Sequence, residues 1–110
     1  MTLEPIDYEM MARALNLATK GIYTSTPNPS VGCVITQNGK IVGEGYTKPA
    51  GGNHAEIEAL SRISDASDCC VYVTLEPCSH YGKTGPCAMA LIDAGVSRVV
   101  VACEDPNPLV

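Results

Sequence analysis

The sequence contains no tryptophan and no phenylalanine, so five tyrosines are its only large aromatic side chains. A core without tryptophan and phenylalanine must come from aliphatic residues, alanine and a few tyrosines, which suits an α/β domain. Positive charge is also scarce, because 7 lysines and arginines face 12 acidic residues and leave a net charge of -5. An acidic chain without a basic run repels polyanions, so we expect a small-molecule substrate and no nucleic-acid partner.

Long apolar runs are missing as well. No stretch approaches the roughly 20 apolar residues that a membrane-spanning helix needs. Residues 1–4, which include the acidic Glu4 and no basic residue, lack the basic and apolar regions of a signal peptide. We therefore expect a cytoplasmic protein with no membrane partner. In that compartment the six cysteines are more typical of metal binding or burial than of disulfide bonds.

The length of 110 residues suits one domain with one site. Its hydrophobic fraction of 45% and charged fraction of 17% are those of a globular chain. Asp7 is placed to cap a first helix that ends near Lys20 and Gly21. The apolar stripe predicted for this helix is Met11, Ala14, Leu15 and Ala18.

The rest of the chain alternates between strand and helix patterns. Residues 31–36 and 41–46 predict two strands joined at Asn38-Gly39, a dipeptide that readily takes the positive φ angles of a tight hairpin turn. The further predicted elements are a helix at 54–64, a strand at 69–74, a helix at 86–92 that stops before Gly95, and a strand at 98–103. This order predicts a mixed sheet covered by helices, with buried final strands. Little sequence remains to cover the last strand, so we expect a fragment of a longer chain.

Three candidate metal ligands lie beside predicted helix starts, namely His54, Cys78 and Cys87. One histidine and two thiolates leave a fourth zinc position for water, which is the arrangement of a catalytic site. Glu56, two residues after His54, is placed to accept the proton of that water and pass it to a leaving amine. The other cysteines fall in predicted strands and are expected to be buried hydrophobic residues: Cys33, Cys69, Cys70 and Cys103.

Each candidate taken alone has a simpler explanation. Asn53 and Glu56 have the spacing of a helix capping box, and a lone His54 is more often a hydrogen-bonded surface side chain. The combination is what favours a catalytic zinc site. A zinc-stabilised module without turnover stays open as an alternative, and a fourth protein ligand on the metal would favour it.

The segments His54-Ala55-Glu56, Pro77-Cys78 and Cys87 resemble the zinc motifs of the cytidine-deaminase-like superfamily. Eight residues, 79–86, separate the two cysteines in place of the usual Cys-x-x-Cys spacing. That longer loop, together with residues 74–80 and the closing Asp-Pro-Asn-Pro at 105–108, resembles the deaminase domain of the bifunctional riboflavin-biosynthesis deaminase/reductase over essentially the whole chain.

This resemblance implies a cytidine-deaminase-like three-layer α/β/α sandwich with a mixed β-sheet, truncated at its C-terminal end. It also implies a hydrolase that deaminates 2,5-diamino-6-(5-phosphoribosylamino)pyrimidin-4-one to the 5-amino pyrimidinedione ribotide and ammonia, using a zinc-activated water and Glu56 as proton shuttle. Residues 1–110 are then the zinc-dependent deaminase domain of a longer, multifunctional homo-oligomeric enzyme, whose NADPH-using reductase domain is absent here. A nucleoside, nucleobase or tRNA deaminase is the alternative, but such enzymes lack the long loop.

The resemblance further implies a set of substrate contacts. An asparagine in a Pro-Asn-Pro loop recognises the base, and the loop between the two cysteines faces the substrate with a positive charge and a titratable donor for a ribose phosphate. The candidate substrate-binding residues are Asn28, His80, Lys83, Asp105 and Asn107. Two departures concern substrate contacts and leave the metal and base untouched: Thr47 stands where many relatives have histidine, and Gly85 where many have proline.

Overall fold

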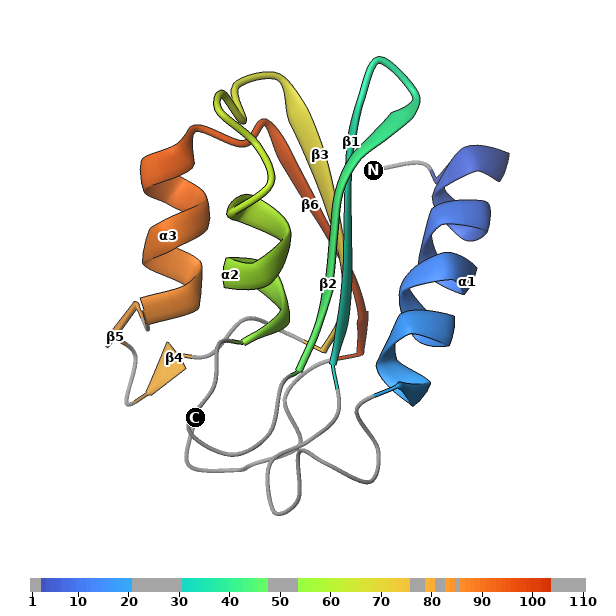
Figure 1. Cartoon of the computed structure of the whole chain (residues 1–110), viewed down its shortest axis with the longest axis horizontal. Coiled ribbons are helices and arrows are strands. Elements are labelled where there is room, and N and C mark those ends of the chain that lie inside the picture. Colours follow the sequence, from blue (N-terminus) through green and yellow to red (C-terminus); the bar gives the residue numbers. More distant parts are fainter. Residues whose placement is uncertain are drawn as a thin grey trace.

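The computed structural model describes residues 3–20, 31–47, 54–75, 79–80, 83–84 and 86–103. At positions 75, 79–80, 83–84, 86–89 and 103 it describes the backbone alone. The helices and strands in these ranges are α1 Pro5–Thr19, β1 Gly32–Gln37, β2 Lys40–Tyr46, α2 Ala55–Leu60, β3 Cys69–Leu75, β4 Ser79–His80, β5 Lys83–Thr84, α3 Pro86–Ala94 and β6 Arg98–Cys103. Figure 1 shows their arrangement.

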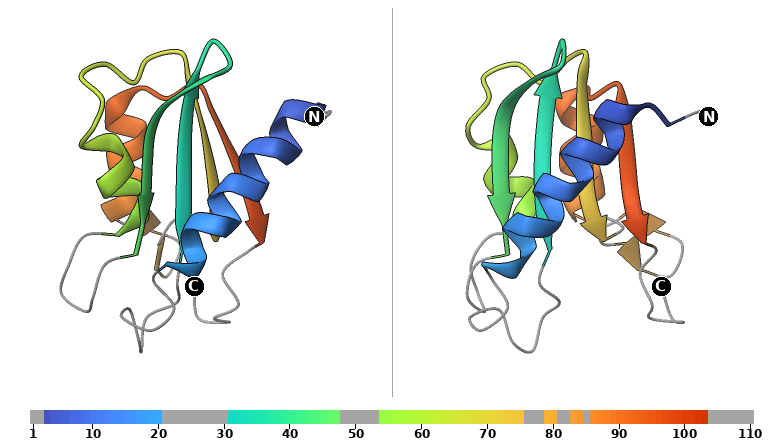
Figure 2. Two further views of the ribbon diagram at one scale, coloured as in Figure 1. Left: turned by 45° about the vertical axis from the view of Figure 1, so that its right-hand side comes forward. Right: turned by 90° about the vertical axis from the view of Figure 1, so that its right-hand side faces the viewer.

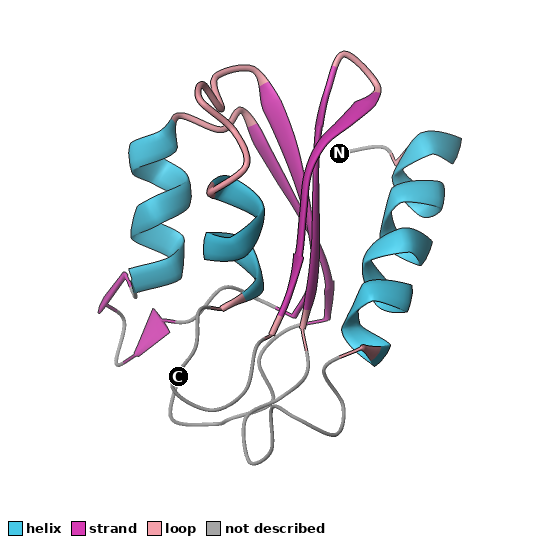
Figure 3. Ribbon diagram, viewed as in Figure 1, coloured by secondary structure: helices cyan, strands magenta, loops and turns pink. Residues whose placement is uncertain are grey.

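Four strands form the main sheet in the order β2-β1-β3-β6. Strand β1 is antiparallel to both β2 and β3, whereas β3 and β6 are parallel, so the predicted mixed sheet is confirmed. Helix α1 covers one face of the sheet, and α2 and α3 cover the other (Figure 3). The predicted three-layer α/β/α sandwich is therefore confirmed. The short antiparallel pair β4-β5 was not predicted, because two-residue strands leave no periodic pattern.

The hairpin between β1 and β2 turns where the sequence predicts it. Asn38 and Gly39 have φ angles of 53° and 79°, a left-handed pair that asparagine tolerates and glycine adopts without a steric penalty. The register shifts between Ile35 and Thr36, which marks a β-bulge in the pairing with β2.

The prediction that Asp7 is the capping residue of the first helix is wrong in position, because Asp7 is the third helical residue and completes a capping box with Glu4. The cap is Glu4, and Pro5 takes the first helical position, where its missing N–H costs nothing. The Asp7 carboxylate accepts a hydrogen bond from the backbone N–H of Glu4 at 2.8 Å, but it is buried and also accepts bonds from the Tyr72 hydroxyl at 2.7 Å and the Arg98 guanidinium at 2.8 and 3.0 Å. Asp7 thus ties α1 to β3 and β6.

The predicted stripe of α1 is right at Ala14 and wrong at Leu15. Ala14 is fully buried and Leu17, three residues further, shares its face, whereas Leu15 is 50% exposed. One helical step turns a side chain by about 100°, which carries Leu15 away from the sheet. Met11 and Ala18 are half-buried, as expected at the margins of the contact face.

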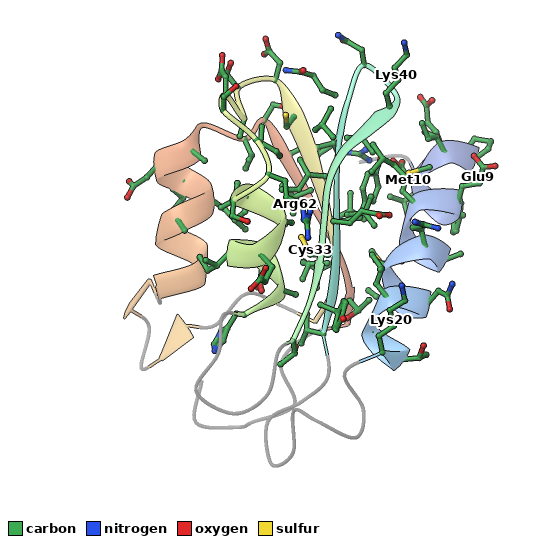
Figure 4. The ribbon with its side chains drawn as sticks, in the orientation of Figure 1. Glu9, Met10, Lys20, Cys33, Lys40 and Arg62 are labelled. Carbon is green, nitrogen blue, oxygen red and sulfur yellow. The ribbon has the colours of Figure 1, made fainter. Side chains whose placement is uncertain are left out.

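The core has two parts, one on each face of the sheet. Alternate residues of a strand point to opposite faces, so Cys33 and Ile35 pack beneath α2 and α3 while Val34 packs beneath α1. Figure 4 shows Cys33 between the sheet and α2, and Met10 between the sheet and α1. Burial is confirmed for Cys33 and Cys69, Cys70 is half-buried, and the Cys103 side chain lies outside the description.

The last predicted strand exists but is less buried than expected. Strand β6 is an edge strand of the described sheet, because it pairs with β3 alone there. Val101 is accordingly 37% exposed, and Ala102 is exposed as well. The continuous apolar run at 99–103 predicts a strand but does not tell a central strand from an edge strand.

Helix α2 is shorter than predicted and α3 slightly longer. After Leu60 the backbone N–H groups of Arg62 and Ile63 donate to the third residue before them, which tightens the chain into a turn. Ile63 still packs against the core, so the spacing of apolar residues continues beyond the end of the helix. Helix α3 begins at Pro86 as predicted. In the part of the chain that the structure covers, no helix has the length and apolar character to cross a bilayer.

Candidate active site

One end of the sheet gathers the elements that carry the predicted site. Strands β3 and β6 both finish there, and α2 and α3 both start there and contact each other (Figures 1 and 2). His54 is the N-cap residue of α2, and Cys87 is the second residue of α3. The fold therefore brings the chain at His54, Glu56 and Cys87 to the same end of the molecule.

His54 and Glu56 have contrasting environments although only one residue separates them. The His54 side chain is exposed, and its carbonyl accepts a hydrogen bond from the backbone N–H of Glu58 at 3.0 Å, which starts the helix. Glu56 is the second residue of α2 and is only 4% exposed. A buried carboxylate and an exposed imidazole thus lie in one turn of chain.

Burial is the main influence on the Glu56 carboxyl group. It raises the pKa of Glu56 above its ordinary value, while a hydrogen bond from the residue's own backbone N–H and the nearby His54 lower that pKa by less. The alternative explanation of Glu56 as part of a capping box is wrong in register, because the N-cap is His54 and not Asn53. Glu56 therefore needs another reason to be a buried acid.

The remaining predicted site residues are only partly visible. Asn28, Cys78, Asp105 and Asn107 lie outside the described residues, and the structure describes only the backbone of His80, Lys83 and Cys87. Among the side chains that the structure does describe, no three His, Cys, Asp or Glu residues lie close enough to hold a metal ion. Since only one of the three predicted zinc ligands, His54, has a described side chain, the zinc site stays a prediction.

The loop between the two predicted cysteine ligands has a structure of its own. Its strands β4 and β5 pair so that His80 stands directly opposite Lys83. Residues opposite one another in an antiparallel pair are neighbours. The two loop residues with candidate substrate roles are therefore brought together by backbone pairing, and β4 also contacts α3.

Two threonines outside the predicted set of site residues hold the start of β1. The Thr47 hydroxyl accepts a hydrogen bond from the backbone N–H of Val31 at 2.8 Å and donates to the carbonyl of the same residue at 3.3 Å. The Thr74 hydroxyl accepts from the N–H of Gly32 at 3.1 Å. Thr47 is only 5% exposed, and its hydroxyl forms hydrogen bonds with the backbone of Val31, which lies two residues after the Pro-Asn-Pro segment.

Comparisons with known proteins agree with this architecture. A family model described as "Cytidine and deoxycytidylate deaminase zinc-binding region" matches residues 5–103. The riboflavin biosynthesis protein RibD of Haemophilus influenzae is 58% identical over 105 residues, which make up 94% of this chain and 28% of that protein. The diaminohydroxyphosphoribosylamino-pyrimidine deaminase of Buchnera aphidicola subsp. Schizaphis graminum is 52% identical over 101 residues, 91% of this chain and 69% of that protein.

Solved structures agree as well. Form 1 of Acinetobacter baumannii RibD has a TM-score of 0.87 and 51% identity, over 94% of this chain and 29% of that chain. The chain thus spans less than a third of the length of the two RibD proteins. The fold predicted from the sequence is confirmed by this match.

Proposed function

The chain belongs to the cytidine and deoxycytidylate deaminase zinc-binding family, and from that premise we propose that it deaminates a pyrimidine ribotide in riboflavin biosynthesis. The substrate is 2,5-diamino-6-(5-phosphoribosylamino)pyrimidin-4-one, and the products are the 5-amino pyrimidinedione ribotide and ammonia. The observation that carries the proposal is the buried Glu56 beside the exposed His54, at the end of the sheet where α3 also begins. The similarity to proteins named RibD and diaminohydroxyphosphoribosylamino-pyrimidine deaminase supports the choice of substrate.

The proposed zinc ligands are His54, Cys78 and Cys87. An imidazole and two thiolates form a donor set that suits zinc, and the common location of the α2 and α3 starts supports the inclusion of His54 and Cys87. The first turn of α3 also favours a thiolate, because its backbone N–H groups and helix dipole stabilise negative charge. When bound there, zinc supplies the Lewis acidity that activates water.

Glu56 is the proposed proton carrier. Its carboxylate takes a proton from the attacking water and later delivers that proton to the departing amine, so one side chain serves both transfers. Its burial keeps the carboxylate away from bulk solvent. The proposed substrate contacts complete the site: Asn28, His80, Lys83, Asp105 and Asn107.

A single assay tests the reaction and its substrate together. Zinc-loaded protein should release ammonia from the ribotide and not from cytidine. Glu56→Gln should retain zinc and lower kcat by about 10²- to 10⁴-fold, the usual contribution of a general acid–base. Glu58→Gln is the matched control, since Glu58 is a half-buried acid in the same helix and should keep the wild-type rate. Release from cytidine alone would refute the riboflavin assignment, and a Glu56→Gln variant at wild-type rate would remove Glu56 from the mechanism.

The metal ligands are tested by zinc content. Cys78→Ser and Cys87→Ser should each lower the zinc bound per chain and the melting temperature, because a metal that binds only the folded state stabilises that state. Cys70→Ser is the control, because Cys70 lies in β3 and is half-buried against the α1 side of the sheet. Full zinc content in both Cys78→Ser and Cys87→Ser would contradict the ligand assignment.

The setting of the proposed reaction follows from the family resemblance. Residues 1–110 form one deaminase domain that works as a homo-oligomer in the cytoplasm. Light scattering coupled to size-exclusion chromatography tests the assembly, because a single chain has a mass of 11.5 kDa. A monomeric mass at micromolar concentration would refute the oligomer.

A further inference from the structure

The face of β2 beneath α2 carries no side chain at two alternate positions. Gly43 and Gly45 share this face because residues two apart in a strand point the same way, and both are buried. A Cβ atom built on Gly45 would lie 2.4 Å from the carbonyl oxygen of Ala55 and 2.8 Å from the backbone nitrogen of Ala59. These distances are shorter than any ordinary van der Waals contact, so the backbone of α2 rests directly on that of β2.

Glycine is required at positions 43 and 45 because a side chain has no room there, and not because the backbone conformation needs it. Among the glycines that the structure describes, Gly39 and Gly95 have positive φ angles, whereas Gly43 and Gly45 do not. Any L residue can adopt the backbone of an ordinary strand. Glycine inside a strand often marks the close approach of another backbone, and the contacts of Gly45 with α2 are such an approach.

The helix side of this contact is equally small. Ala55 and Ala59 are four residues apart, hence on one face of α2, and both are fully buried against the core that contains Cys33 and Ile35. In the sheet, Gly45 pairs with Cys33 and Gly43 with Ile35. Glycine on the strand and alanine on the helix together set the distance between the two elements.

We infer that Gly45 is a positioning residue, whose missing side chain sets how closely the first turn of α2 lies against the sheet. Ala55, whose carbonyl oxygen meets Gly45, lies between His54 and Glu56 in the chain. An alanine at position 45 needs at least 3.4 Å to that oxygen, so the first turn must move outward by about 1 Å. The catalytic consequence rests on the proposed function, in which His54 and Glu56 act from this turn.

The test compares Gly45→Ala with a second variant of smaller expected effect, Gly43→Ala, and with a control, Val34→Ala, in the zinc-loaded protein. Gly43→Ala meets the same helix one turn later, with its Cβ 2.5 Å from the Ala59 carbonyl oxygen. Val34→Ala destabilises the opposite face of the sheet, because Val34 is fully buried in the core beneath α1. Gly45→Ala should lower kcat by about 10- to 100-fold with little change in KM, since a 1 Å misplacement of a catalytic group has an effect of this size.

A spectroscopic signal separates positioning from loss of stability. In the cobalt(II)-substituted protein, Gly45→Ala should shift the d–d bands, because His54 moves with the first turn of α2. Gly43→Ala should shift them less, and Val34→Ala should leave them at the wild-type wavelengths at temperatures where each variant is folded. Wild-type kcat and bands in folded Gly45→Ala would overturn the inference, as would an equal loss of kcat in a Val34→Ala variant of matched melting temperature.

Two further outcomes remain decisive. If Gly45→Ala does not fold, Gly43→Ala takes its place, because its Cβ would press on the Ala59 carbonyl oxygen of the same six-residue helix and should cause a smaller loss of kcat and a smaller band shift. Wild-type kcat and bands in folded Gly43→Ala would then overturn the inference. A wild-type protein without thiolate-to-cobalt bands would contradict the proposed metal site and not the packing. In that case the NMR amide resonances of Ala55 and Glu56 still report whether the substitution displaces α2. The variant measured is Gly45→Ala, or Gly43→Ala if only that one folds, and unchanged resonances would overturn the inference.

Discussion

Thr47→Val removes a hydroxyl that closes the open end of the β1-β2 hairpin. Valine has nearly the same shape, so the change deletes the acceptor of the Val31 N–H, which lies 2.8 Å away, and leaves the packing intact. A partly buried N–H that loses its acceptor costs about 1–3 kcal/mol. At roughly 4 °C per kcal/mol for a chain of this size, the melting temperature should fall by about 4–12 °C.

The control is Thr47→Ser, which keeps the oxygen and removes one methyl group. Its cost should be about 0.8 kcal/mol, the value of one buried methylene. Urea unfolding monitored by circular dichroism measures both variants, and an unchanged slope against urea shows that the unfolded states are comparable. If Thr47→Val proves as stable as Thr47→Ser, the hydroxyl bonds to Val31 contribute nothing and the reasoning is refuted.

Asp7→Asn should flatten the acid limb of the stability curve. Hydrogen bonds from Arg98, Glu4 and Tyr72 hold the pKa of the Asp7 carboxyl well below its ordinary 3.8. The ionised carboxylate therefore stabilises the folded wild type above about pH 4, and this contribution to the free energy of unfolding is lost as the pH falls. Urea unfolding between pH 7 and pH 3 measures the loss, and an equally steep loss in Asp7→Asn would contradict this explanation. Ile35→Ala should cost about 2–5 kcal/mol in the same assay and Ile41→Ala less than about 1 kcal/mol, because the first isoleucine is fully buried and the second is 41% exposed. Equal losses would refute the assignment of Ile35 to the core.

Local signals predict most of this fold because short stretches of chain determine its elements. Asn38-Gly39 specifies a tight turn by itself, and within a helix Pro86 suits only the first turn. Asp7 shows where such reasoning stops. An acid near a helix start indicates a cap, yet its guanidinium partner Arg98 lies 91 positions further along the chain. Leu15 is similar, since the face of α1 that meets the sheet depends on contacts that helical periodicity does not contain.

In the candidate site, too, some features can be predicted from local sequence and others depend on long-range packing. His54 and Glu56 are recognisable because zinc chemistry requires particular side chains at a particular spacing. They lie at the first turn of α2, one exposed and one buried, and no motif encodes the distance at which that turn packs on β2. It is set by Gly45, a residue with no functional group, which meets the carbonyl oxygen of Ala55 between the two. Chemical motifs therefore identify the groups that act, while the placement of those groups also depends on residues whose relevant property is their small size.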